Sequence, residues 1–299
     1  MNHTSSTFKS GFIVIVGAPN AGKSTLLNRV LGEKISITSQ RPQTTRNRIL
    51  GVMHRPNAQL VFIDTPGIHP ARQTLNVRIV DQAVSAMGDG DLVLFVVDAA
   101  QSDLDAEALL LKKLKATSKP AVLALNKIDL VDKPELLSRL DKWQNQHDFA
   151  DMVPISATRG TQVDVLIQAM EKLLPDGPPF FEEDMLTDLP QRFLAAEIIR
   201  EKVFRMTGQE IPYSTAVTVT DFSKKDRGRI VHIHATIHLE RDSQKGIVIG
   251  KGGRKLGQIG EAARKSIEQM LETKVFLKLL VRIQKNWSRD TKALRKFGY

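Results

Sequence analysis

The chain contains no cysteine among its 299 residues. It therefore has no disulfide, no thiolate zinc site and no catalytic thiol, and a reducing compartment is expected. Long hydrophobic runs are also missing, since the most apolar stretches, residues 12–16 and 92–97, are far shorter than the roughly 20 residues that cross a bilayer. The N-terminus lacks the pattern of a secretory signal. These absences together predict a cytoplasmic protein.

Acidic residues are scarce in the last third of the chain. Residues 190–299 carry 23 Lys and Arg against 11 Asp and Glu, whereas residues 1–189 carry 20 against 22. The formal net charge of +10 is therefore concentrated in one part of the chain, which indicates that one domain binds a polyanion. The hydrophobic fraction of 41% is that of a globular protein, and the length favours two domains.

Short apolar runs alternate with helical patterns over residues 1–174. The runs expected to form strands are residues 12–16, 46–53, 60–64, 92–98, 121–126 and 152–156. This alternation predicts an α/β domain with a mostly parallel sheet and helices on both faces. Ligands of such sheets bind beyond the carboxyl ends of the strands.

Proline and glycine are dense in residues 175–189, which predicts a linker. Beyond it, residues 190–299 predict a second domain with a basic C-terminal tail. Its expected elements are a helix (191–206), two strands (213–222 and 229–240), a short helix (243–249), a longer helix to about residue 272, and a strand (274–284). The resulting order is α-β-β-α-α-β, an α+β domain.

A phosphate-binding motif follows the first predicted strand. It comprises Gly17, Ala18, Pro19, Asn20, Ala21, Gly22, Lys23 and Ser24, with Thr25 next, and it matches G-x-x-x-x-G-K-[ST]. Glycines let backbone N–H groups surround phosphates at a helix N-terminus. Lys23 is expected at the β- and γ-phosphates, and the Ser24 hydroxyl at Mg²⁺. The alternative is an ordinary strand-to-helix turn.

Two further motifs end later strands. The first is Asp64, Thr65, Pro66 and Gly67, where Asp64 would hold Mg²⁺ through water and the Gly67 N–H would meet the γ-phosphate. The second is Asn126, Lys127 and Asp129, and its carboxylate accepts both N1–H and N2–H of guanine. Adenine would present a lone pair there, so GTP is favoured over ATP. Ser156 and Ala157 would contact the guanine oxygen. The alternatives are a plain turn and a polar helix start.

These motifs resemble, in order and spacing, those of the translation-factor-like small GTPases. The resemblance implies a threonine that completes Mg²⁺ coordination, for which Thr45 is preferred and Thr44 is the neighbouring candidate. Lys23, Thr45 and Gly67 are then the contacts to the transferred phosphate. Ile68 stands where Ras-like proteins carry a water-orienting glutamine, so slow intrinsic turnover is expected. Arg46 and Arg48 give no identifiable arginine finger.

Asn20 offers one compensation for Ile68. A subgroup of related GTPases with G-x-P-N-x-G-K-S uses this asparagine to hold a potassium ion against the phosphates. The resemblance makes K⁺ a second candidate cofactor beside Mg²⁺, with Asn20 as its ligand. The alternative is that Asn20 only stabilises its own turn.

A second glycine loop lies in the basic domain. Gly250, Lys251, Gly252 and Gly253 form a G-x-x-G loop between two predicted helices, followed by Arg254 and Lys255. With the α-β-β-α-α-β order it resembles a type II KH domain, in which such a loop clamps RNA backbone. A plain helix-turn-helix is the alternative. A second copy, Gly257 to Gly260, is interpreted as glycine on a packed helix face.

Two other features of this domain remain open. His232, His234 and His238 share a strand face, which is interpreted as solvated or RNA-facing rather than as a metal site. The basic tail is either a terminal helix packed on the domain or an RNA contact. Its relevant residues are Trp287, Arg289, Lys292, Arg295 and Lys296.

The whole chain resembles the Era-like GTPases, bacterial ribosome-assembly GTPases with a C-terminal type II KH domain. The stretches that carry the match are residues 17–24, 42–46, 187–204 and 250–260. The family implies binding of 16S ribosomal RNA near its 3′ end, maturation of the 30S subunit, GTP and GDP as ligands, no DNA, and peripheral association with the inner membrane. A constitutive RNA-binding chaperone with a structural nucleotide is the competing hypothesis.

Overall fold

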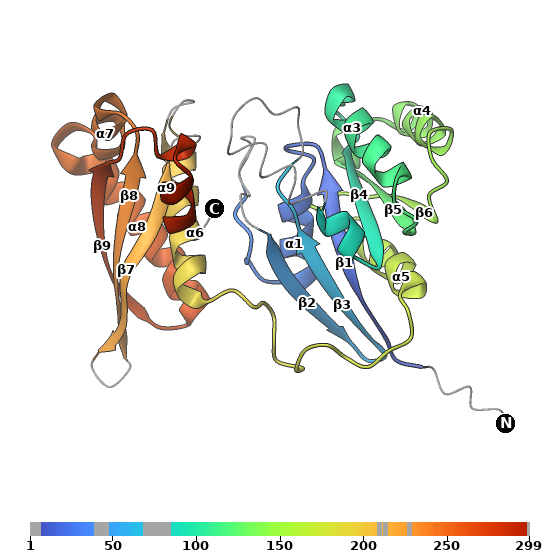
Figure 1. The fold of residues 1–299 in the computed structure, drawn as a ribbon, viewed down its shortest axis with the longest axis horizontal. Helices are drawn as coiled ribbons and strands as arrows, with labels where there is room; N and C mark the ends of the chain where they lie inside the picture. Colours follow the sequence, from blue (N-terminus) through green and yellow to red (C-terminus); the bar gives the residue numbers. More distant parts are fainter. Residues whose placement is uncertain are drawn as a thin grey trace. The chain divides into compact units, whose positions relative to one another are not determined.

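The chain folds into two compact units, which Figure 1 displays as a ribbon. The computed structural model describes residues 7–38, 48–67, 85–207, 211, 215–225 and 229–297. The first unit contains most of the chain up to Asp188, and the second begins at Leu189; Ile37 and Thr38 group with the second. In the described residues no helix is long and apolar enough to cross a membrane.

The first unit is built on a six-stranded sheet in the order β2-β3-β1-β4-β5-β6. Its strands are β1 (Lys9–Gly17), β2 (Ile49–Arg55), β3 (Ala58–Asp64), β4 (Leu92–Asp98), β5 (Ala121–Asn126) and β6 (Asp151–Pro154). Only β2 runs antiparallel to its neighbour, so the predicted mostly parallel sheet is confirmed. The last strand ends two residues before the predicted Ser156, because Ser156 turns to pair its backbone with Gly160 and Thr161.

Helices cover both faces of this sheet. Val14, Phe95 and Leu123 point toward α3 (Leu104–Lys115) and α4 (Lys133–Gln144) and form one core with them. Side chains alternate along a strand, so their neighbours point to the opposite face. That face contacts α1 (Lys23–Leu31) and α5 (Val163–Leu173). The arrangement brings the carboxyl ends of β1, β3, β4 and β5 to one edge, where the nucleotide motifs begin.

The segment after α5 is bound to the sheet of the first unit. The Gln59 side chain, fully buried on β3, accepts hydrogen bonds from the N–H groups of Phe180 and Phe181 and donates to the Phe181 carbonyl. The N–H of Val52 donates to the Leu186 carbonyl at 2.8 Å. Residues 180–187 are therefore held along β2 and β3 as an ordered strap, and composition alone gave no sign of this.

We expect Gln59→Ala to release this strap. The substitution removes the partner of two backbone N–H groups and one carbonyl. Each such group costs about 1–3 kcal/mol of stability if it stays buried without a hydrogen bond, so the segment should detach into water instead. Amide exchange at Phe180 and Phe181 should speed up at least about tenfold, which corresponds to about 1.4 kcal/mol. Exposed Gln191→Ala is the matched control. Unchanged exchange in Gln59→Ala would show that the glutamine does not hold the segment.

The second unit has the predicted α-β-β-α-α-β order. Its elements are α6 (Gln191–Met206), β7 (Ala216–Lys225), β8 (Ile230–Leu239), α7 (Asp242–Ile249), α8 (Arg254–Leu271) and β9 (Lys274–Ile283), followed by the short α9 (Thr291–Lys296). The sheet order is β7-β8-β9, with β7 antiparallel and β9 parallel to β8. Helices α6 and α8 pack on one face against Ile233, Ile237 and their neighbours.

The basic tail packs on its own domain. Trp287 is fully buried, and its ring lies 5.3 Å from that of Phe297. The Phe297 ring in turn lies 4.4 Å from that of His238, whose Nε2 contacts the Thr218 hydroxyl. The interpretation of His238 as solvated or RNA-facing is therefore wrong, because the tail covers it. His232 and His234 remain half-buried.

Candidate nucleotide site and RNA-binding loop

The loop between β1 and α1 has the backbone of a phosphate cradle. Gly22 adopts φ 99°, and a Cβ there would lie 2.2 Å from the Asn126 side chain, so only glycine fits. Asn20 adopts φ 63°, a conformation that asparagine tolerates. Helix α1 has no side-chain cap at its N-terminus. Its first N–H groups and its dipole therefore favour an anion at this point.

Lys23 lies inside this loop. Its ammonium donates to the carbonyls of Gly17 and Ala18 at 3.0 and 2.9 Å. Burial lowers the pKa of Lys23 to about 8, and the nearby Asp64 carboxylate partly opposes this shift. Phosphate oxygens would supply the missing counter-charge and raise the pKa again.

GDP affinity should therefore fall in alkaline solution. With the pKa of Lys23 at about 8, about nine-tenths of the side chain is charged at pH 7 and about one-tenth at pH 9. Binding that requires the charged form should weaken about tenfold between these pH values, with proton uptake at pH 8. Titration calorimetry measures both. Lys23→Met should bind GDP weakly, with an affinity that does not change with pH. A wild-type GDP affinity that does not change between pH 7 and pH 9 would contradict the assignment of Lys23 to the phosphates.

Asp64, at the end of β3, gathers hydroxyl groups around a fully buried carboxylate. Its Oδ2 accepts a hydrogen bond from Ser24 at 2.8 Å and one from Ser36 at 3.1 Å. Asn28 fixes Ser36 in place by accepting from its N–H and donating to its carbonyl. Three side-chain oxygens beside the phosphate cradle are the hard ligands that Mg²⁺ prefers. The predicted Ser24 and Asp64 are brought together, and Ser36 joins them unpredicted.

The remainder of the D-x-x-G motif closes against the phosphate loop. The Thr65 hydroxyl is buried and donates to the Ile15 carbonyl at 2.7 Å, so it anchors the chain to β1. At Gly67 a Cβ would lie 2.8 Å from the Pro19 Cα and 3.2 Å from the Lys23 ammonium. A glycine is required at this close approach, which leaves the Gly67 backbone next to Lys23.

Asn126 joins three parts of the site. Its side-chain amide donates to the Ala21 carbonyl at 2.8 Å, and its oxygen accepts from the Ala157 N–H at 2.9 Å. The phosphate loop, the end of β5 and the loop after β6 are thus fixed to one another by one buried side chain. Ser156, also buried, accepts from the Arg159 N–H through its hydroxyl. The predicted base-reading residues therefore lie together.

The two charged members of the N-K-x-D motif each have a partner. Lys127, at φ 66°, directs its ammonium to the Asp98 carboxylate at the end of β4. Asp129 lies in a 3₁₀ turn (Ile128–Leu130), and its Oδ2 is 3.5 Å from Nε of the exposed Arg159. Asp98 was not singled out in the sequence, because an aspartate at a strand end carries no motif of its own.

Four residues that the sequence analysis discussed fall outside the described residues. They are Thr44, Thr45, Arg46 and Ile68. The third Mg²⁺ ligand and the position of the missing glutamine therefore remain predictions from the sequence. The Lys296 side chain is outside the described part as well.

The G-x-x-G loop in the second unit lies where α7 gives way to α8. Gly250, Gly252 and Gly253 all have positive φ, at 72°, 61° and 77°. A Cβ added at Gly252 would have no heavy atom within 4 Å, so the loop surface is open. Lys251 and Arg254 are exposed, and Lys255 is half-buried. Within the described residues none of the three forms an ion pair.

The second G-x-x-G copy lies inside α8. Gly260 faces Leu279 of β9, and a Cβ there would be at an ordinary contact distance of 3.5 Å. Gly257 faces open space. Both glycines lie within the helix, but only Gly260 agrees with the interpretation as glycine on a packed helix face, because Gly257 is exposed.

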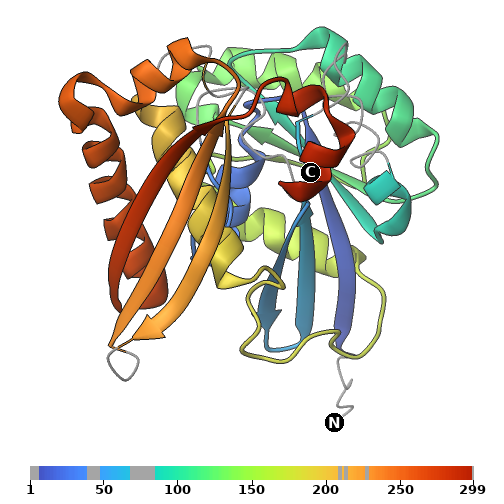
Figure 2. The same cartoon turned by 60° about the vertical axis from the view of Figure 1, so that its left-hand side comes forward.

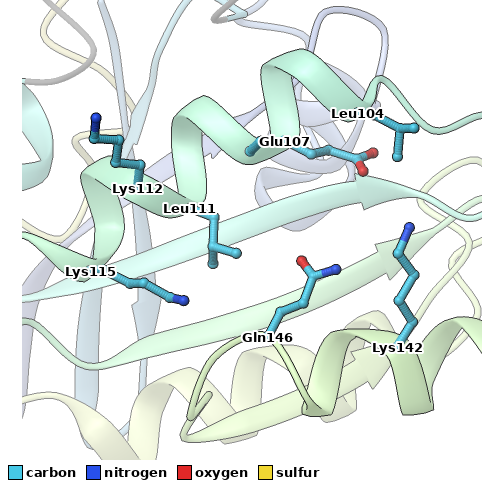
Figure 3. A pocket seen from close by; sticks show the side chains of 8 residues that line it. Leu104, Glu107, Leu111, Lys112, Lys115, Lys142 and Gln146 are labelled. Atoms are coloured by element: carbon cyan, nitrogen blue, oxygen red, sulfur yellow. The ribbon is translucent and has the colours of Figure 1, made fainter.

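A groove of about 480 Å³ between α3 and α4 lies apart from all these motifs (Figure 3). It is lined by Leu104, Glu107, Ala108, Leu111, Lys112, Lys115, Lys142 and Gln146. Burial raises the pKa of Glu107, although the Asp103 N–H and nearby Lys142 oppose the shift. The lysines lie in the last turns of their helices, where they offset the helix dipole. That role explains them without a ligand.

Fold and site together define a P-loop GTPase joined to a KH domain. The family of 50S ribosome-binding GTPases matches residues 12–127, and the KH domain family matches residues 210–288. The chain is 54% identical over 292 residues to the GTPase Era of Geobacter metallireducens, with 98% of each chain covered. It is 53% identical to that of Geobacter sp. strain M21, again over 98% of each. The chain belongs to the Era family of GTPases.

Two solved structures share the fold over almost the full length. A point variant of Aquifex aeolicus Era bound to GDP.AlF4⁻ is 40% identical with a TM-score of 0.93, covering 98% of this chain and 99% of that one. An Era complex with MgGDPNP and nucleotides 1506–1542 of 16S ribosomal RNA is also 40% identical, with a TM-score of 0.94 and the same coverage.

Proposed function

We propose that the protein is a GTP-hydrolysing switch that binds 16S ribosomal RNA near its 3′ end and assists maturation of the 30S subunit. The observation that carries the proposal is the presence, in one chain, of a phosphate loop joined to the Asp64 carboxylate and the N-K-x-D motif, and of an open, basic G-x-x-G loop. The 40%-identical Era complex that contains MgGDPNP and 16S nucleotides supports the same pairing of ligands. Residues 1–174 would hydrolyse GTP, residues 175–189 link, and residues 190–299 bind RNA.

Each nucleotide-site residue has a role that follows from its place. The phosphate loop Gly17–Ser24 and Thr25 would enclose the phosphates, with Lys23 at the β- and γ-phosphates and the Gly67 N–H at the γ-phosphate. Asp129 would accept the hydrogen bonds of guanine, while the hydrogen bond between Asn126 and Ala157 fixes the two loops that contact the base. Lys127 would keep its ammonium on Asp98.

The oxygen cluster at Asp64 fits a magnesium ion. Ser24 would bind the metal directly, Asp64 through water, and Thr45 in the GTP state. A magnesium ion held there would supply positive charge to offset the negative charge that develops on the phosphates. The protein's own part is to hold Ser24 and Asp64 at 2.8 Å, with Ser36 as a third buried oxygen that keeps the carboxylate oriented.

Because isoleucine at position 68 cannot orient water, the side chain of Asn20 is proposed to hold K⁺ against the phosphates. Hydrolysis should then be at least about tenfold faster in potassium than in sodium at equal ionic strength. Asn20→Ala should remove the difference and spare GTP binding. Asn20→Gly should also remove the difference, and it controls for backbone strain because glycine adopts the φ of 63° without strain. Equal rates in both salts would end this proposal.

The RNA half would act through Gly250, Lys251, Gly252, Gly253, Arg254 and Lys255, whose glycines allow close phosphate approach and whose cations neutralise it. On the family resemblance alone, we propose a cytoplasmic protein that associates peripherally with the inner membrane. No DNA role is proposed.

The direct test of the enzyme assignment is phosphate release from GTP by the full chain. Wild type should turn over slowly, and Asp64→Asn should lose most of the rate while keeping GDP affinity, because GDP depends less on the metal. Asp151→Asn, on an exposed strand end, is the control. Equal rates for wild type and Asp64→Asn would contradict the assigned site.

A further inference from the structure

The face of the second unit's sheet that points away from α6 and α8 is covered by the C-terminal tail at His238, where the Phe297 ring packs, and His232 and Phe276 lie further along it. Figure 2 shows β7, β8 and β9 in front of α6 and α8, so the outward face of the strands is turned to the viewer. The inward positions, among them Ile233, Ile237 and Val275, are buried in the domain core. The outward positions of β8 and β9 lie side by side, with Phe276 opposite His232 and Lys278 opposite His234.

Apolar side chains and cations alternate along the outward side of the edge strand β9. Phe276 is 50% exposed and Leu280 45% exposed, and the exposed Lys278 and Arg282 stand between and after them. The Phe276 ring lies 5.0 Å from that of His232, tilted by 33°. Two neighbouring strands thus present a paired aromatic platform flanked by cations.

The charge on this face is mostly positive. Its outward positions hold the cations Lys225, Lys274, Lys278 and Arg282 and a single carboxylate, Asp221. Asp221 lies on β7 and accepts a hydrogen bond from the Ser223 hydroxyl at 3.3 Å. Neither Lys278 nor Arg282 forms an ion pair with any residue that the structure describes. A second copy of the chain would place like charges against each other, so self-association is disfavoured.

We propose that this face, defined by His232, Phe276, Lys278, Leu280 and Arg282, is a second contact for single-stranded RNA. Bases stack on exposed aromatic rings regardless of sequence, and interspersed cations follow the backbone. Helices α7 and α8, which carry the glycine loop, both pack against β9. The strand that carries these cations is therefore packed directly against the two helices that hold the loop. The inference rests on the proposed RNA-binding function and extends its site.

The test uses the full chain and a fluorescein-labelled 12-nucleotide oligouridylate. Phe276→Leu keeps an apolar side chain but removes the ring and should weaken binding about tenfold, whereas Phe276→Trp should retain it. Lys278→Gln with Arg282→Gln should make the slope of log K against log salt shallower by about 1.4, at about 0.7 per lost phosphate contact. Lys112→Gln on the first unit should leave it unchanged. Melting curves verify that each variant is folded.

Crosslinking gives the direct readout. With 4-thiouridine in the same oligomer, the peptide that contains Phe276 should be labelled in wild type and in Gly252→Asp. If wild type binds no RNA at all, the proposed function fails. A different result overturns only this inference: wild type binds RNA, Gly252→Asp weakens binding, and the Phe276 and Lys278/Arg282 variants bind like wild type. In that case the peptide that contains Phe276 is not crosslinked in any of these proteins. The face would then suit an acidic protein.

Discussion

Asp129→Asn is expected to move base preference from guanine to xanthine. Xanthine carries an oxygen where guanine has its 2-amino group, and the asparagine amide can donate to it. GTP affinity should fall at least about a hundredfold, because the guanine donors lose a shared carboxylate acceptor. The affinity of the variant for XTP should be higher than that of wild type. The exposed Arg159 partner contributes little to either result, since such ion pairs are weak.

Asp132→Asn provides the matched control for this change. Asp132 lies three residues away and caps α4 by accepting from the Glu135 N–H, a role that asparagine fills equally well. It should leave both affinities unchanged. Titration of each variant with non-hydrolysable analogues of GTP and XTP measures the outcome. Unaltered guanine affinity in Asp129→Asn, with no gain for xanthine, would remove Asp129 from the base site.

Gly252→Asp should weaken RNA binding at least about tenfold while leaving GTP hydrolysis without RNA nearly intact. The substitution places a carboxylate where a phosphate should approach, and like charges repel there. Because Gly252 is exposed and its Cβ position is open, the added side chain meets no neighbouring atom in the protein. The loss should therefore come from charge rather than from unfolding.

Gly252→Asn separates charge from backbone strain. Asparagine tolerates the φ of 61° as well as aspartate does and has nearly the same volume, but it is neutral. It should retain several times more RNA affinity than Gly252→Asp. Circular dichroism and a melting curve accompany the binding assay. A folded Gly252→Asp protein with normal RNA affinity would refute the role of the loop.

Much of the fold is readable from local pattern. Strands β4 and β5 begin and end where the apolar runs do, because both are buried and bounded by polar residues. The order of elements in the second unit follows from period-2 and helical patterns in the same way. The nucleotide motifs are equally visible, since each is a fixed spelling at the end of a strand.

What the sequence did not reveal depends on contacts between distant residues. Ser36 reaches Asp64, Lys127 reaches Asp98, and Gln59 holds Phe181, yet no local pattern marks any of these partners. Helix α6 gives another example. Arg200 is fully buried and donates two hydrogen bonds to the Glu197 carboxylate. An amphipathic pattern would place both charged residues on the solvent-exposed side of the helix, so their burial could not be predicted from it.

The central claim is that nucleotide state governs RNA binding, and one measurement tests it most directly. RNA affinity of the full chain is measured with GDP and with a non-hydrolysable GTP analogue at the same salt concentration. A switch predicts affinities that differ by at least about fivefold, because a nucleotide shifts an equilibrium only through its unequal affinity for two states. Equal affinities with both nucleotides would contradict the switch and favour a constitutive RNA-binding protein.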